Sequence, residues 1–126
     1  MSDKKNRTLP DAELEVMQIL WDLEAPVPRT AVEEGMAKLR PMAQTTLLTL
    51  LTRLAEKGFV KIEKQGRSSV YTPLVARADY QAQQSRRIWD RIFGGSPSAF
   101  ASALTASGIS KEDLDELRRL LEEGEL

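Results

Sequence analysis

The segment from Gln44 to Thr72 constrains the fold of this chain most, because its pattern changes midway from a helical period to an extended one. Its first half carries four leucines at the spacing of a single helix face, namely Leu47, Leu50, Leu51 and Leu54. Thr45, Thr49 and Thr52 fall on the opposite face, at about 100° per residue. Gly58 stands where a left-handed C-terminal cap is expected. This half is therefore predicted to be an amphipathic helix with small polar residues on its outer side.

The second half of the segment is rich in β-branched and aromatic residues. Phe59–Lys64 and Ser69–Thr72 are predicted to be strands, and Gln65–Ser68 is predicted to join them as a polar, basic tip. A helix with a small-polar outer face, followed at once by a hairpin, is typical of a winged helix-turn-helix. In that fold the helix enters the major groove of DNA, and the hairpin contacts the flanking backbone or minor groove.

The preceding chain supplies the other elements that this fold needs. Asp11–Leu23 is predicted to be the first helix, which the proline-containing segment Ala25–Pro28 ends. Within that segment, Val27 is predicted to form a one-residue strand against the hairpin. Thr30–Leu39 is predicted to be the second helix, with its first residue as N-cap and Glu33 as the capping-box partner. These elements complete a winged-helix domain.

The chain after the hairpin is predicted to form three short helices, one over residues 77–93, one capped by Ser96 and one capped by Ser110. Their apolar stripes are too short to form a core of their own, so we expect them to pack against a second copy as a twofold homodimer. The alternative is that they fold back on the N-terminal domain. The predicted dimer-interface residues are Tyr80, Ile88, Trp89, Ile92, Phe93, Phe100, Leu104, Leu114, Leu117 and Leu121.

The whole chain is therefore predicted to be mainly α-helical with a small β-hairpin wing. Its expected parts are a flexible polar arm over residues 1–8, a winged helix-turn-helix DNA-binding domain over residues 9–75, and a helical dimerisation domain over residues 76–126.

Positive charge is concentrated on the predicted helix and hairpin, although the formal net charge of the chain is −1. Residues 40–72 carry six basic and two acidic side chains, whereas residues 97–126 carry three basic and seven acidic ones. Local charge governs attraction to phosphates more than the total does. The distribution therefore favours double-stranded DNA as the partner of the helix and hairpin.

The first two turns of the predicted recognition helix are expected to approach base edges, as in other helix-turn-helix proteins. Threonine can donate or accept a hydrogen bond and can contact a thymine methyl group, and Leu48 either contacts such a methyl group or flanks the core. The predicted base-reading residues are Gln44, Thr45, Thr46, Leu48 and Thr49. The predicted DNA-backbone contacts are Arg29, Thr30, Arg53, Lys57, Lys64, Arg67 and Ser68.

The sequence lacks the residues that most catalytic and metal sites require. It contains no cysteine and no histidine, which excludes disulfides, thiolate zinc sites and most nucleophilic triads. We therefore expect no enzyme activity, no metal and no cofactor. No apolar run approaches the roughly 18 residues of a membrane span, and Met1–Arg7 is polar and charged, unlike a signal peptide. A cytoplasmic protein without membrane insertion is the expected result.

Four segments in this order and at this spacing resemble the penicillinase-repressor (BlaI/MecI-type) family of bacterial winged-helix transcriptional repressors. They are LPDAELEVMQILW (Leu9–Trp21), TLLTLLTRLAEKGFV (Thr46–Val60), GRSSVYTPLV (Gly66–Val75) and FGG (Phe93–Gly95). Each segment is moderately specific by itself, whereas the four together are strongly specific. The resemblance covers the chain from Leu9 to Leu121.

The resemblance implies a homodimer that binds an inverted-repeat operator and represses transcription by occluding a promoter. In the best-known members the inducing signal is a β-lactam, which links the family to the regulation of antibiotic resistance. A membrane-bound metalloprotease-sensor detects the drug, and cleavage within the dimerisation domain of the repressor releases the DNA. Such a sensor is therefore an implied partner of this chain.

This chain departs from the pattern of the drug-responsive members at two places. Those members often have basic residues at the positions of Thr45 and Leu48, and these are neutral here, so the half-site can differ. The resemblance places the cleavage region near Ser102 and Ala103, where the Asn-Phe pair of those members is absent. Copper-responsive relatives carry a cysteine cluster, which this chain lacks.

Two other classes of function are compatible with a winged helix. One is a protein-interaction module, or an accessory domain of an enzyme complex, that would show no salt-dependent affinity for DNA. The other is a ligand-sensing regulator with a pocket around Tyr80 and Trp89. The basic residues of the hairpin argue against the first class.

Overall fold

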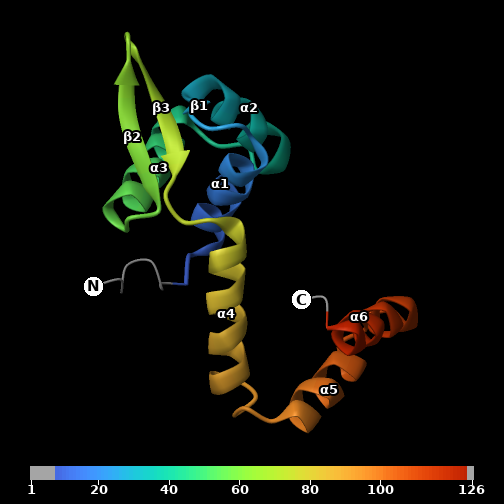
Figure 1. Ribbon diagram of the computed structural model, residues 1–126. Coiled ribbons are helices and arrows are strands. Elements are labelled where there is room, and N and C mark those ends of the chain that lie inside the picture. Colours follow the sequence, from blue (N-terminus) through green and yellow to red (C-terminus); the bar gives the residue numbers. More distant parts are fainter. Residues whose placement is uncertain (1–7, 125–126) are drawn as a thin grey trace. The chain divides into compact units, whose positions relative to one another are not determined.

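The computed structural model of the protein describes residues 8–124. It is mainly α-helical with one small antiparallel sheet, as the sequence predicts. The elements in chain order are α1 (Asp11–Asp22), β1 (Val27–Pro28), α2 (Arg29–Leu39), α3 (Gln44–Glu56), β2 (Val60–Gln65), β3 (Ser68–Pro73), α4 (Arg77–Arg91), α5 (Pro97–Ala106) and α6 (Lys111–Glu123) (Figure 1). The predicted polar arm lies outside the described residues except for Thr8. The chain divides into two compact units after Gln84, so that α4 begins in the first unit and ends in the second.

The sheet of the first unit has the strand order β1-β3-β2, with both pairs antiparallel. Val27 pairs with Tyr71, which confirms the predicted short strand against the hairpin. Gln65 pairs with Ser68, so only two residues form the loop at the hairpin tip. Gly66 takes the first loop position with φ of 67°, a left-handed conformation that glycine adopts without a steric penalty.

The core of the first unit draws apolar side chains from its three helices, its sheet and the first turn of α4. Phe59 is fully buried, and its ring meets the ring of Tyr80 edge-on at a centroid distance of 5.9 Å. The Tyr80 hydroxyl accepts a hydrogen bond from the backbone N–H of Leu9 at 2.9 Å. The indole N–H of Trp21 donates to the carbonyl of Val75 at 2.8 Å. These contacts anchor the beginning of α4 in the first unit.

The position of Tyr80 corrects one predicted interface residue. Tyr80 is 5% exposed and belongs to the core of the winged-helix unit, so its ring does not lie on a surface open to a second copy. The sequence suggests an interface role because Tyr80 lies on the apolar side of α4. In the structure, the first turn of α4 packs its apolar side against the core of the first unit. For the same reason Tyr80 does not support the predicted ligand pocket, and the compact unit extends beyond the boundary expected at residue 75.

The start of α2 also differs from the prediction. The helix begins at Arg29, and its N-cap is Pro28 with extended backbone angles (φ −68°, ψ 151°) and no side-chain capping bond. Proline has φ fixed near the value needed here, and β1 already holds this residue extended, so the helix starts directly after the strand. Thr30 is therefore inside the helix, and Glu33 forms an ion pair with Arg29 at 3.3 Å instead of completing a capping box.

A partly buried ion pair joins α1 to the end of α3. Glu13 is 3% exposed, and its carboxylate accepts a hydrogen bond from the ammonium group of Lys57. Removing the cation leaves a buried carboxylate without its partner, which carries a desolvation cost. We expect Lys57→Ala to lower the free energy of unfolding in urea by about 1–3 kcal/mol.

The matched control for this prediction is Lys61→Ala. Lys61 also pairs with a glutamate, Glu63, at 3.2 Å, but both side chains are more than half exposed. An exposed pair of this kind contributes about 0–1 kcal/mol. Equal losses of stability in the two variants would contradict the structural importance of the Glu13–Lys57 pair.

The second unit is built from the end of α4 and from α5 and α6. Its two predicted caps are confirmed, since the hydroxyls of Ser96 and Ser110 accept hydrogen bonds from the backbone N–H groups three residues ahead, at 3.1 and 3.0 Å. Phe100 packs edge-on against Trp89 and Phe93, with centroid distances of 5.5 and 5.0 Å. Neither α5 nor α6 buries any side chain fully among the described residues.

Within residues 8–124, no helix has the length and apolar character that crossing a membrane requires.

Candidate nucleic-acid interface

The inner face of α3 fixes which residues its outer face presents. Four leucines are buried in the core with exposed fractions of at most 7%, namely Leu47, Leu50, Leu51 and Leu54. Because this face of the helix packs against the core, the opposite face of its first two turns is exposed, and it carries Gln44, Thr45, Thr46 and Thr49. Gly58 follows the helix with φ of 85°, the left-handed conformation predicted for its cap. The structure therefore exposes four of the five residues that the sequence singles out for base contacts, and Leu48 is half-buried.

Thr49 and Leu48 are the best-defined members of this outer face. The Thr49 hydroxyl donates a hydrogen bond to the Thr45 carbonyl at 3.0 Å, one helical turn earlier. Leu48 is half-buried and packs against the core. It also lines a surface hollow together with Thr49 and Thr52. The core packing predicted as one alternative for Leu48 is thus present, and its contact with a thymine methyl group stays a prediction.

The turn that leads into α3 is held by Arg40, a residue to which the sequence gives no role. Arg40 follows the last residue of α2, and its guanidinium donates two hydrogen bonds to the carboxylate of Glu15 on α1, one of them at 3.0 Å. These hydrogen bonds hold the pKa of Glu15 below its usual value and raise the pKa of Arg40. The pair spans 25 residues of sequence, so no local pattern signals it.

The basic residues between positions 40 and 72 fall into two groups. Arg40, Lys57 and Lys61 are engaged in ion pairs with glutamates of the first unit. Arg53, Lys64 and Arg67 are exposed, and they form no ion pair with any of residues 8–124. The sequence cannot separate these groups because charge counts do not show which acid lies beside which base.

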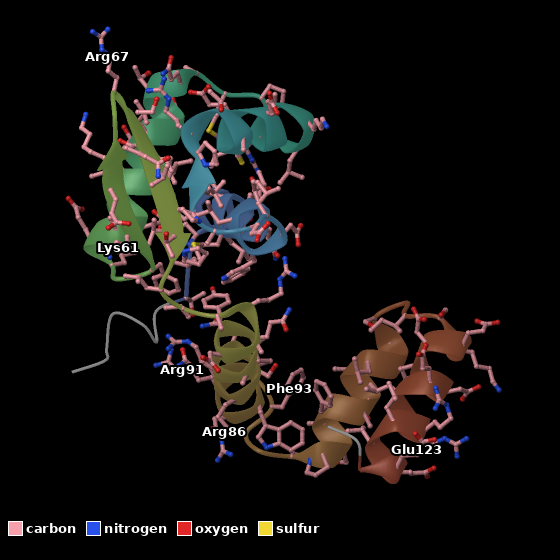
Figure 2. The ribbon with its side chains drawn as sticks, turned by 45° about the horizontal axis from the view of Figure 1, so that its top comes forward. Lys61, Arg67, Arg86, Arg91, Phe93 and Glu123 are labelled. Atoms are coloured by element: carbon pink, nitrogen blue, oxygen red, sulfur yellow. The ribbon has the colours of Figure 1, made fainter. Side chains whose placement is uncertain are left out.

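Of these exposed basic residues, Arg53 lies on α3, whereas Lys64 and Arg67 lie on the hairpin. Figure 2 shows that Arg67 projects from the tip of the hairpin, away from the strands that carry it. The loop glycine lets the chain reverse in two residues, which places Arg67 at the extreme end of the wing. Figure 1 shows the hairpin running back from the end of α3 toward the side of the unit on which α3 begins. The wing and the first turns of α3 are thereby brought to one side of the first unit.

The other residues predicted to contact the DNA backbone differ in their exposure and in their ion pairs. Ser68 is exposed directly after the tip, and Thr30 is exposed in the first turn of α2. Arg29 is half-buried and paired with Glu33. Lys57 is 19% exposed and its ammonium group is paired with Glu13, which disfavours the predicted phosphate contact for this residue.

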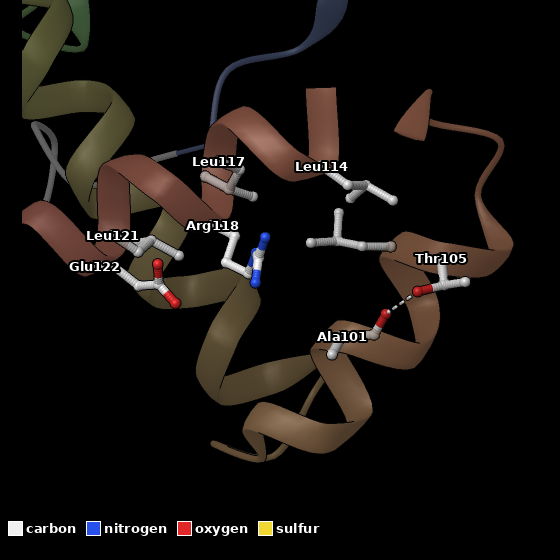
Figure 3. Close-up of a pocket in the computed structure, with 8 residues that line it drawn as sticks. Ala101, Thr105, Leu114, Leu117, Arg118, Leu121 and Glu122 are labelled. Carbon is white, nitrogen blue, oxygen red and sulfur yellow. Dashed lines mark hydrogen bonds between the residues drawn. The ribbon is translucent and has the colours of Figure 1, made fainter. Parts of the chain in front are cut away.

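The second unit carries an apolar groove between α5 and α6. Its volume is about 390 Å³, and Figure 3 shows the leucines of α6 facing residues of α5 across it. The groove is lined by Ala101, Leu104, Thr105, Leu114, Leu117, Arg118, Leu121 and Glu122. Four of the predicted interface residues thus meet at one place, namely Leu104, Leu114, Leu117 and Leu121, the last of which is 59% exposed.

Other predicted residues of the second unit lie on its surface. Ile88 and Ile92 are 42% and 70% exposed on the end of α4. Ser102 and Ala103, the predicted cleavage region, are exposed within the helix α5. No group of acidic side chains among residues 8–124 is arranged to hold a metal ion.

The three helices, the three-stranded sheet and the protruding hairpin of the first unit define a winged helix-turn-helix. Comparison with known sequences then gives the family. The penicillinase repressor family model matches residues 9–123, and the chain belongs to this family.

Individual relatives match the sequence of this protein over most of its length. The penicillinase repressor of Bacillus licheniformis is 32% identical over 121 residues, which cover 95% of this chain and 94% of the relative. The methicillin resistance regulatory protein MecI of Mammaliicoccus sciuri is 29% identical over 120 residues, which cover 94% and 97%. Among solved structures, the monomeric form of Bacillus licheniformis BlaI in complex with the blaP half-operator is 35% identical, with a TM-score of 0.50, and the match covers 59% of this chain and 89% of that one.

Proposed function

We propose that this protein is a sequence-specific DNA-binding transcriptional repressor that acts in the cytoplasm as a homodimer on an inverted-repeat operator. The observation that carries the proposal is that one side of the first unit carries exposed, uncharged residues of α3 together with cations that form no ion pair within residues 8–124. Base contacts are assigned to Gln44, Thr45, Thr46, Leu48 and Thr49. Phosphate contacts are assigned to Arg53, Lys64, Arg67 and Ser68, with Arg29 and Thr30 at the start of α2. The half-operator complex of the Bacillus licheniformis relative supports the choice of DNA as ligand.

The proposed dimer is supported by the exposed apolar surface of the second unit. The groove between α5 and α6 and the isoleucines at the end of α4 present leucine and isoleucine side chains that are only partly covered within residues 8–124. A second copy of the same surface can bury them, and twofold symmetry is the commonest closed arrangement for such a contact. Because one winged helix offers only a small DNA interface, two half-sites held by one dimer supply the affinity and specificity.

Release of the promoter would then follow from loss of the dimer. A membrane-bound metalloprotease-sensor is the partner that we propose for this step, by analogy with the drug-responsive members of the family. The region that it would cut, Ser102–Ala103, is exposed but helical, so cleavage requires this part of α5 to unwind locally.

The direct test is fluorescence anisotropy with DNA from upstream of the protein's own gene, against a shuffled duplex at physiological salt. The expected result is tight binding to the native fragment alone, with two protein chains per duplex. Binding of equal strength to both duplexes would contradict sequence-specific repression at this site. Absence of salt-dependent binding to either duplex would favour a protein-interaction module instead.

Substitution of the residue at the wing tip tests the phosphate assignment. We expect Arg67→Ala to weaken binding to every DNA sequence and to reduce the slope of log affinity against log salt by about one unit. Arg119→Ala on α6 is the control, because Arg119 is an exposed arginine that pairs with Glu123 at 3.2 Å in the second unit. An unchanged salt slope in Arg67→Ala would remove the wing tip from the DNA contact.

A further inference from the structure

The turns of α3 that are proposed to contact bases, residues 44–52, carry no charged side chain, which limits the ways in which they can recognise a base pair. Residues 44–52 contain no Asp, Glu, Lys or Arg, and the first charge of the helix is Arg53. Guanine is most often read by a bidentate Arg or Lys, and adenine by a bidentate Asn or Gln. Only Gln44 offers such a side chain within these turns. Discrimination between base pairs must therefore come mainly from other groups.

The hydroxyl protons of the threonines are only partly available. The Thr49 hydroxyl already donates to the Thr45 carbonyl at 3.0 Å, so its proton is used within the helix. Thr49 is exposed, and the groups that this bond leaves to it are its methyl group and the lone pairs of its oxygen. This part of the surface therefore behaves more like an apolar contact than like a hydrogen-bond donor.

Apolar groups gather beside Thr49 on the outer side of α3. Leu48, Thr49 and Thr52 line a hollow of about 330 Å³ that Arg53 and Glu56 complete. Leu48 is fixed in this position because its other side packs against the core. The part of this hollow formed by Leu48, Thr49 and Thr52 offers methyl groups on a helix proposed to enter the major groove, where the 5-methyl group of thymine projects.

We infer that this protein recognises its half-site largely through the 5-methyl groups of thymine, with Thr49 and Leu48 as the specificity-determining contacts. The inference rests on the proposed function, because it concerns the same face of α3. It specifies that the contacted half-site contains thymines opposite Leu48 and Thr49, and that its recognition depends on methyl groups rather than on hydrogen bonds from these residues.

The test begins with selection of preferred sites by the full-length protein from randomised duplex DNA. Thymines of the selected half-site are then replaced one at a time by uracil, which removes the 5-methyl group and keeps every hydrogen-bonding group. We expect uracil at a contacted position to weaken binding about fourfold, the effect of uncovering one methylene-sized group. Uracil outside the footprint is the control and should leave the affinity unchanged.

Two substitutions of the same residue separate the methyl group from the hydroxyl. Thr49→Ser keeps the hydroxyl and loses the methyl group. This variant should therefore bind with equal affinity to DNA that has thymine and to DNA that has uracil at the position opposite residue 49. Thr49→Val loses the hydroxyl and keeps a methyl group in the same place, so it should still prefer thymine. Thr49 is exposed, so neither change disturbs the core.

The outcomes distinguish this inference from the proposed function. If no sequence is preferred in the selection, the proposed sequence-specific function fails, and the inference fails with it. If a sequence is preferred but uracil binds as well as thymine, only the inference is overturned. The same holds if Thr49→Ser discriminates thymine from uracil as strongly as the unaltered protein does.

Discussion

Leu117→Asp is expected to convert the protein to a monomer and to abolish tight operator binding, while the winged-helix unit stays folded. Leu117 lines the apolar groove between α5 and α6 and is 36% exposed in the single chain. In a twofold dimer the substitution removes two apolar contacts of about 1.5–3 kcal/mol each and places two carboxylates in an apolar contact. A loss of at least about 4 kcal/mol corresponds to roughly a thousandfold weaker dimer.

Two measurements on the same variant decide the matter. Sedimentation equilibrium at micromolar concentration reports the dimer, and anisotropy with the full operator reports DNA binding. The control is Leu117→Met, which nearly conserves volume and apolar character and should retain both properties. A monomeric Leu117→Asp protein that still binds the operator with full affinity would show that dimerisation and repression are not coupled in the way proposed.

Local patterns in the sequence predicted the elements that local physics determines. The leucine spacing located α3, Gly58 marked the end of that helix, and Ser96 and Ser110 marked the starts of α5 and α6. Each of these signals lies within one or two helical turns, where side chains and backbone act on their immediate neighbours. The family resemblance stated from the sequence was confirmed by the family match over residues 9–123.

Contacts between distant parts of the chain were not predictable in this way. Glu13 and Lys57 are 44 residues apart, and nothing local indicates that they meet in a partly buried pair. Tyr80 illustrates the same limit. An apolar face in the sequence of a helix predicts that this face is buried, but it does not identify the part of the protein that buries it. Gln44, Thr45, Thr46 and Thr49 are exposed on α3, and their contact with DNA stays a prediction, whereas Lys57 has a structural partner that a charge count cannot reveal.

Phe59→Ala is expected to destabilise the winged-helix unit most among single core substitutions. Phe59 is fully buried, and it lies at the junction of α3 and the hairpin. Its backbone N–H donates to the Leu54 carbonyl at 2.9 Å, and its carbonyl accepts from the N–H of Leu74 at 2.8 Å. The ring also packs against Tyr80 at the start of α4. The backbone of Phe59 thus links the end of α3 to the base of the wing, and its buried ring fills the core at this junction and contacts the start of α4.

Truncation of a buried Phe to Ala costs about 3–5 kcal/mol, because apolar contacts are lost and a cavity remains. Small domains are stable by only about 5–15 kcal/mol, so urea unfolding followed by circular dichroism should show a midpoint far below that of the unaltered protein. Ile62→Ala is the matched control, since Ile62 lies on the neighbouring strand β2 and is 40% exposed, and its loss should be about 1 kcal/mol or less. If the two variants unfolded at the same urea concentration, Phe59 would not be the residue that joins the wing to the reading helix.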